Sequence, residues 1–189
     1  MDTINSVINP THTLPIHITP VRGWQRVIQR LAATHVAGWF LSRWLPSLDR
    51  FILRRTNGKH TAASFLTGLP IITLTTFGAK SGQPRACPLI PIPDGERVIL
   101  IASNFGSTRH PTWYTNLRAR PEAILTLNGA DVAYSARETT EPERQTYWAQ
   151  AVKLYPGYHA YEHRARGRKF PILVLTPKSD RRPETEDGI

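Results

Sequence analysis

The chain has few of the residues that would cross-link it or carry it across a membrane. Its single cysteine, Cys87, excludes an internal disulfide framework and fits a reducing compartment, so we expect a cytoplasmic protein. No apolar run approaches the length of about 20 residues that a membrane-spanning helix needs. The opening MDTINSVINPTHTLP contains an early acid, two prolines and no hydrophobic segment, which is not the pattern of a signal peptide.

Acidic residues are also scarce, with 14 Asp and Glu against 24 Lys and Arg and a formal net charge of +10. Such a field concentrates anionic partners but does not select among nucleic acid, an anionic membrane surface and a polyanionic cofactor. The basic residues are dispersed, and no recognised nucleic-acid motif accompanies them. We therefore expect no nucleic-acid partner.

The first third of the chain is predicted to form an arm followed by helices. Residues 1–20 are polar and rich in proline, whereas Trp24 to Leu31 has apolar residues at i, i+3, i+4 and i+7 and arginines on another face. The pattern predicts basic amphipathic helices within residues 1–60. They either pack on the following domain with their arginines in water, or contact a membrane surface peripherally through residues 22–53.

From Leu69 onward the pattern is typical of strands. Residues 69–77, 97–103, 122–128, 132–137 and 170–176 are rich in β-branched and apolar residues, and Asn128-Gly129 is a strong signal for a tight hairpin. Thr140 and Glu143 form a capping box that predicts a helix ending before Pro156. Strands with mostly short connections favour an α+β, mainly β fold, a small antiparallel barrel with helices outside it. We assign this domain to residues 61–177 and a polar tail to residues 178–189.

Two loops between the predicted strands carry anion-binding chemistry. Glycines in the segment 78–83 allow a sharp turn and expose backbone amides, and Lys80 and Arg85 add positive charge. The spacing is neither that of a Walker loop nor that of a dinucleotide fingerprint, and a hairpin with solvated basic residues is the alternative. The segment 103–110 is rich in hydrogen-bond donors and precedes Pro111, where a helix N-terminus would favour an anion.

One tyrosine-rich segment adds a possible substrate surface. Tyr155, Tyr158 and Tyr161 recur every three residues, so their phenols would line one side of a short helix and stack on a flat substrate. Packing inside the protein is the alternative. The seven histidines are scattered without a third ligand near any pair, so no metal site is predicted.

Together these segments resemble the deazaflavin-dependent nitroreductase family, the split-barrel group that uses coenzyme F-420. The resemblance covers residues 48 to 177 and rests on LTTFGAKSGQPRACPL, RVILIASN, HPTWYTNL and YPGYHAYEHRA followed by FPILVL. It implies a split antiparallel β-barrel of the FMN-binding kind, a homodimer, and an oxidoreductase whose cofactor carries a phosphate and a polyglutamate tail.

The same resemblance implies a role for particular residues. The phosphate and tail would be held by Lys80, Ser81, Gln83 and Arg85. The ring would be bordered or supported by Cys87, Pro88, Ala102, Ser103, Asn104, Trp113 and Asn116. Ser103, Tyr155, Tyr158 and Tyr161 would be the catalytic residues facing the acceptor.

Four positions depart from the nitroreductase pattern. Ala79 and Asn104 stand where nitroreductases have arginine and lysine, which removes charge from the tail site, while Cys87 replaces an asparagine and Ile90 a tyrosine. We therefore expect hydride transfer from reduced F-420 to an electron-poor planar acceptor, a quinone or enone in preference to a nitroaromatic. An FMN-dependent reductase of the same fold and a non-catalytic binder of lipid or cofactor at a membrane are the alternatives.

Overall fold

A computed structural model describes residue 16 and residues 69–178 of the chain. The predicted arm and amphipathic helices of residues 1–60, and with them the membrane contact through residues 22–53, lie outside the described residues. Residues 61–68 and 179–189 lie outside them as well. The division of the chain into these three parts therefore stays a prediction.

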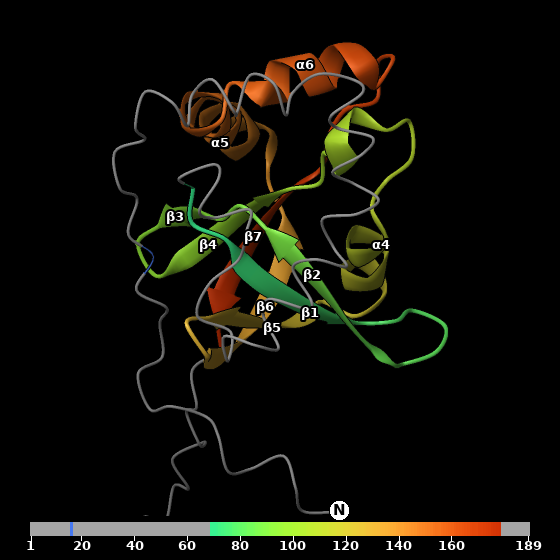
Figure 1. Ribbon diagram of the computed structural model, residues 1–189, viewed down its shortest axis with the longest axis vertical. Helices are drawn as coiled ribbons and strands as arrows, with labels where there is room; N and C mark the ends of the chain where they lie inside the picture. Colours follow the sequence, from blue (N-terminus) through green and yellow to red (C-terminus); the bar gives the residue numbers. More distant parts are fainter. Residues whose placement is uncertain (1–15, 17–68, 179–189) are drawn as a thin grey trace, which may run out of the picture.

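Seven antiparallel strands form one sheet that curls into a partly open barrel (Figure 1). Its order is β2-β1-β5-β6-β7-β4-β3. The strands are β1 (Ile72–Phe77), β2 (Pro84–Leu89), β3 (Ile92–Asp94), β4 (Arg97–Ile101), β5 (Glu122–Leu127), β6 (Ala130–Glu138) and β7 (Ile172–Pro177). The expected mainly β fold is confirmed.

Short helices lie against this sheet. They are the 3-10 turn η1 (Asn104–Gly106), α4 (Thr112–Ala119), α5 (Glu141–Leu154) and α6 (Gly157–Arg164). Helix α4 lies against β1, α5 contacts β3 and β7, and α6 contacts η1 and α5. Figure 1 shows α5 and α6 together at one end of the sheet and α4 at its side, as the predicted outer helices require.

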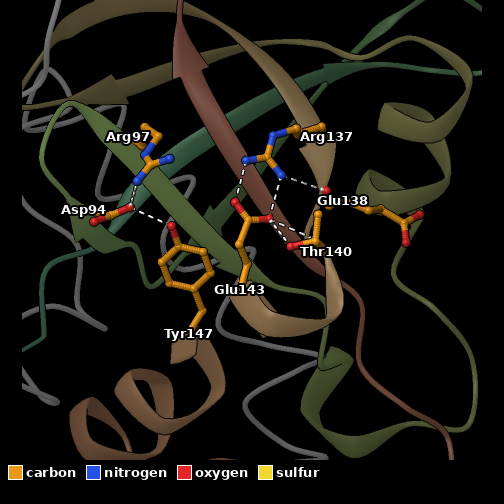
Figure 2. A network of polar contacts seen from close by, with 7 residues as sticks. All are labelled: Asp94, Arg97, Arg137, Glu138, Thr140, Glu143 and Tyr147. Carbon is orange, nitrogen blue, oxygen red and sulfur yellow. Dashed lines mark hydrogen bonds and ion pairs between the residues drawn. The ribbon is translucent and has the colours of Figure 1, made fainter. Parts of the chain in front are cut away.

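Local sequence signals explain the turns and helix ends. Asn128 and Gly129 have φ values of 53° and 83°, the left-handed conformation that a tight hairpin between β5 and β6 needs. The capping box is present, with the Thr140 backbone N–H donating to the Glu143 carboxylate at 2.8 Å. Arg137 donates two hydrogen bonds to the same carboxylate, at 2.6 and 2.8 Å, and ties the start of α5 to β6 (Figure 2).

A second polar contact fixes α5 to the β3 edge of the sheet. Tyr147 donates a 2.6 Å hydrogen bond to Asp94, which also pairs with Arg97 at 2.6 Å (Figure 2). Because Asp94 ends β3 and Arg97 starts β4, this contact holds the helix to the β3–β4 hairpin.

Strands β4 and β7 are buried on both faces and separate two apolar cores. Val98, Leu100, Leu173 and Leu175 point into one core, which the sheet and α4 enclose and which we call the barrel core. The alternate residues point into a second core beneath α5 and α6, which we call the helix-side core; from these strands it receives Ile99, Ile101, Ile172 and Val174. This two-sided burial explains the unbroken apolar runs of both strands.

Strand β2 forms one edge of the sheet and pairs only with β1 among the described strands. Its first three residues are exposed and its last three are partly buried. Two of the six residues, Pro84 and Pro88, are prolines, which lack the backbone N–H of a ladder.

Candidate functional site

The hairpin loop between β1 and β2 holds the residues predicted to bind an anionic tail. Backbone hydrogen bonds close the loop, from Gly78 N–H to the Gln83 carbonyl at 2.9 Å and from Gly82 N–H to the Gly78 carbonyl at 2.7 Å. Gly82 has φ +67°, a conformation that glycine adopts without steric cost. The side chains predicted to bind the tail are all exposed on this hairpin; they are Lys80, Ser81, Gln83 and Arg85.

A buried amide on α4 anchors this hairpin. Asn116 is only 3% exposed and donates to the Thr76 hydroxyl at 3.0 Å. Its side-chain oxygen accepts a 3.1 Å hydrogen bond from the backbone N–H of Ala79. Asn116 therefore fixes the end of β1 and the start of the loop together, which fits the predicted supporting role.

The charge of the hairpin suits a polyanion. From Leu69 to Pro93 the chain contains no aspartate or glutamate. Within residues 69–178 no carboxylate pairs with Lys80 or Arg85. Arg85 lies opposite Thr76 in the strand register, so its side chain is on the sheet face that Asn116 contacts. The donor set fits a ligand with a phosphate and several carboxylates.

Three of the residues predicted to lie near the ring contribute to the barrel core. Trp113 and Ala102 are buried there, and Cys87 packs against the same cluster. Burial raises the pKa of the Cys87 thiol to about 11, so this residue is a neutral wall at ordinary pH. Adjacent strand residues point to opposite faces, so the Pro88 side chain cannot face the same space as that of Cys87.

The turn that follows β4 has an unusual backbone. Asn104, Phe105 and Gly106 all have positive φ, at 49°, 54° and 78°. The Asn104 amide donates to the Arg109 carbonyl at 3.0 Å, and Gly106 N–H donates to the Ser103 carbonyl at 3.0 Å. Non-glycine residues in this region are strained, which is a common property of functional turns. Ser103 begins this turn with 9% of its surface exposed.

Arg168 holds the same turn and was not predicted from the sequence. Its guanidinium donates to the carbonyls of Ala102 (3.1 Å), Ser103 (2.5 Å) and Ser107 (2.8 Å). It also contacts His110 Nδ1 at 3.2 Å, and since a guanidinium only donates, that nitrogen is the acceptor. Desolvation, followed by the positive charge of Arg168, lowers the pKa of His110. Nothing in the segment around Arg168 marks it as a functional residue, because its partners are backbone atoms distant in sequence.

The three tyrosines form a compact group inside the helix-side core. Tyr155 is the residue after α5, while Tyr158 and Tyr161 belong to α6; their ring centroids are 5.4 to 6.0 Å apart with steep interplanar angles. The Tyr155 and Tyr161 hydroxyls are 3.1 Å apart, and each of the three residues is at most 5% exposed. Burial raises the pKa of all three phenols, so they are neutral at ordinary pH.

The turn after β4 reaches this group directly. A Cβ at Gly106 would lie 2.7 Å from the Tyr161 carbonyl oxygen and 2.9 Å from its Cα, so only glycine permits the approach. The Phe105 ring lies 6.1 Å from that of Tyr161.

The predicted residues thus occupy three places. The side chains predicted to bind the tail are on the hairpin that Asn116 of α4 contacts. The residues around Trp113 are in the barrel core, and the tyrosines are in the helix-side core. Strands β4 and β7 separate the two cores, and the turn of residues 103–106 is where the tyrosines approach the barrel side. Within the described ranges no three His, Cys, Asp or Glu side chains gather as metal ligands, and no helix there is long and apolar enough to span a membrane.

A curled antiparallel sheet, outer helices and an exposed cationic hairpin define a split-barrel protein suited to an anionic cofactor. A family model described as F420H(2)-dependent quinone reductase matches residues 48–177. The chain belongs to this family.

Similar proteins agree with that assignment. The F420H(2)-dependent quinone reductase Rv1261c of Mycobacterium tuberculosis (strain ATCC 25618 / H37Rv) is 29% identical over 147 residues, which cover 72% of this chain and 97% of that protein. A solved structure described as an F420-H2 dependent reductase (FDR-A) is 34% identical, with a TM-score of 0.52 over 56% of this chain and 93% of its own. Another, described as a domain-swapped dimer, is 30% identical, with a TM-score of 0.54 over 71% and 98% of the two chains.

These findings confirm the predicted family, the split-barrel fold and an oxidoreductase that uses coenzyme F-420. The individual residues of the site are not tested by them and stay predictions.

Proposed function

We propose that this chain reduces a quinone with reduced F-420. The match to the quinone reductase family over residues 48–177 carries this proposal. The carboxylate-free hairpin with Lys80 and Arg85 supports it, because those cations suit the cofactor's anionic tail. When bound, the cofactor supplies a hydride, which together with one proton converts the quinone to a hydroquinone.

The chain's own residues would bind the cofactor tail, border the ring and contact the acceptor. Lys80, Ser81, Gln83 and Arg85 would hold the tail on the hairpin that Asn116 anchors. Ala102, Trp113 and the neutral Cys87 would border the ring from the barrel side, with Asn104 and the backbone of Pro88 at its margin. The side chains that would contact the acceptor are Ser103, Tyr155, Tyr158 and Tyr161.

Burial of Ser103 and the three tyrosines suits these residues to supply the proton. Because the tyrosine pKa values are raised, the phenols are neutral donors at ordinary pH. Ser103 can donate from the turn that Arg168 holds, to an acceptor oxygen on which negative charge develops.

Anaerobic incubation with reduced F-420 and menadione tests the proposal. We expect the absorbance of the oxidised deazaflavin to appear at a rate proportional to enzyme. Ser103→Ala should lower kcat/KM by roughly ten- to a hundredfold. The matched control Ser107→Ala, at an exposed position of the same loop, should retain the wild-type value. Turnover no faster than the enzyme-free mixture, together with no binding of F-420, would refute the proposal.

We further propose a homodimer in the cytoplasm. A relative described as a domain-swapped dimer supports pairing of two chains, and light scattering after gel filtration would measure the mass. The membrane contact through residues 22–53 is tested separately. Flotation with anionic vesicles should be lost when residues 1–60 are removed, and equal flotation of both chains would refute that contact.

A further inference from the structure

Helix α4 ends next to the cationic hairpin, and the arginine that follows the helix lies close to the hairpin loop. Arg120 follows α4 and precedes Pro121, so it leaves the helix in an extended conformation with φ −141° and ψ 104°. Its guanidinium Nη1 lies 3.6 Å from the point where a Cβ at Gly82 would be. Arg120 is exposed and is 37 or more residues away from the hairpin loop in the sequence.

Asn116, which anchors the hairpin, also holds Arg120 close to the hairpin loop. Arg120 N–H donates to the Asn116 backbone carbonyl at 2.8 Å, while the Asn116 side chain binds the Ala79 backbone N–H. One residue therefore joins the end of α4 to the start of the loop. Figure 1 shows the β1–β2 hairpin projecting beside α4.

The nearest carboxylate in the sequence is already engaged elsewhere. Glu122 pairs with Lys178 at 2.6 Å, and the hydrogen bond from Lys178 is the main reason that the pKa of Glu122 is lowered; Arg120 contributes least. No ion pair joins Arg120 to a carboxylate anywhere in the part of the chain that the structure describes.

We infer that Arg120 is a third cation of the site for the anionic tail of the cofactor, beside Lys80 and Arg85. The inference rests on the proposed function. Ala79 stands where nitroreductases have an arginine. Arg120 would supply positive charge to the same site from a distant segment. Its ligand would be a phosphate or a tail carboxylate, both of which a guanidinium binds with paired hydrogen bonds.

Binding of two ligands that share a ring but differ in charge tests this role. Coenzyme F-420 has the phosphate and the glutamates, whereas its precursor FO has the deazaflavin ring with neither. We expect Arg120→Gln to weaken F-420 binding roughly three- to tenfold, with a shallower salt dependence. Its affinity for FO should be unchanged, and Arg120→Lys should recover part of the loss.

Arg118→Gln is the matched control. Arg118 lies two residues earlier, in the last turn of α4, and its guanidinium lies over the Tyr114 ring, 5.9 Å from the centroid. This variant loses the same charge and should bind both ligands as the wild type does. Thermal unfolding of each variant shows that the fold is retained.

Several results would overturn the inference. Unchanged F-420 affinity in Arg120→Gln would do so, and so would an equal loss for F-420 and FO, or an equal loss in Arg118→Gln. A wild-type chain that binds neither ligand would overturn the proposed function as well, so the two failures are distinguishable.

Discussion

The hairpin and the tyrosine group were both predicted to contact ligands, yet they are opposite environments. The hairpin presents exposed cations, while the three phenols lie in a core at no more than 5% exposure. A ligand can reach Lys80 and Arg85 in the structure as described. Tyr155 and Tyr161 are buried in the helix-side core, so a ligand can reach them only if part of the structure around them moves.

In the proposed function, this difference would separate binding of the tail from supply of the proton. A polyanion needs accessible charge, which high exposure provides. A proton donor for a hydride acceptor benefits from a dry environment, where burial keeps the phenol neutral. The hairpin is held by Asn116 of α4 and the tyrosine group is contacted by the turn after β4, and the following substitutions test each of these contacts.

The largest effect is expected where the turn touches α6. Gly106→Ala introduces a Cβ that would clash with the Tyr161 backbone at a residue with φ +78°, so we expect a loss of about 2–5 kcal/mol in the free energy of unfolding. Urea unfolding measures it. Gly167→Ala, at φ +85° with nothing within 4 Å of the new Cβ, is the control and should lose only about 1–2 kcal/mol. Equal losses would mean that the close approach to Tyr161 is unimportant.

The next largest effect is expected at Asn116, which anchors the hairpin. Asn116→Ala leaves the Ala79 N–H without its side-chain acceptor and the buried Thr76 hydroxyl without its donor, at a cost of roughly 2 kcal/mol. We expect weaker F-420 binding as well, since the loop is no longer fixed. Thr115→Ala, on the exposed face of the same helix, is the control. Wild-type affinity in Asn116→Ala would show that the hairpin needs no anchor.

High pH should destabilise the fold through the tyrosine group. The folded pKa of Tyr155, Tyr158 and Tyr161 is raised above the unfolded value of about 10, so the unfolded chain loses its phenol protons first. Stability is therefore complete below about pH 10 and falls above it, by about 1.4 kcal/mol per pH unit for each such phenol.

Denaturation at pH 9, 10 and 11 measures that slope. Tyr114 and Tyr147 shift in the same direction, so the contribution of the group is isolated by Tyr155→Phe. This variant should reduce the slope, because the pKa of Tyr155 is raised in the folded protein. A slope identical to that of the wild type would contradict the assignment of Tyr155 as a buried neutral phenol.

The smallest effect is expected at Phe105, a residue that is 43% exposed. Phe105→Gly relieves the positive φ of 54° but loses the edge contact with Tyr161 and adds freedom to the unfolded chain. These effects oppose each other, so we expect a change below about 1 kcal/mol in thermal or urea unfolding. A loss above about 2 kcal/mol would make the ring a structural cover of the tyrosine group.

Features that depend on neighbouring residues could be predicted from the sequence. The Asn128-Gly129 hairpin, the capping box of Thr140 and Glu143, and the strand at residues 122–127 all have local causes and are confirmed. The resemblance supplied the split barrel and the cofactor, because the order of several short motifs is more specific than any single one.

Contacts between distant segments could not be predicted in the same way. Arg168 binds backbone carbonyls about 60 residues away, and Arg120 lies beside a glycine 38 positions earlier, so neither leaves a local pattern. The period of three in Tyr155, Tyr158 and Tyr161 indicated one face of a helix. It could not show that Tyr155 lies beyond α5 and that the face is turned into a core.

The prolines of β2 limit how this sheet can grow. Pro84 and Pro88 are four residues apart on an edge strand, so their backbone nitrogens are on the same, outward side, and the row of donors there is interrupted twice in six residues. A strand from another molecule would find few donors there, and Arg85 and the nearby Lys80 add charge repulsion between identical edges. The edge that carries the hairpin is thereby a poor template for edge-to-edge pairing with another chain.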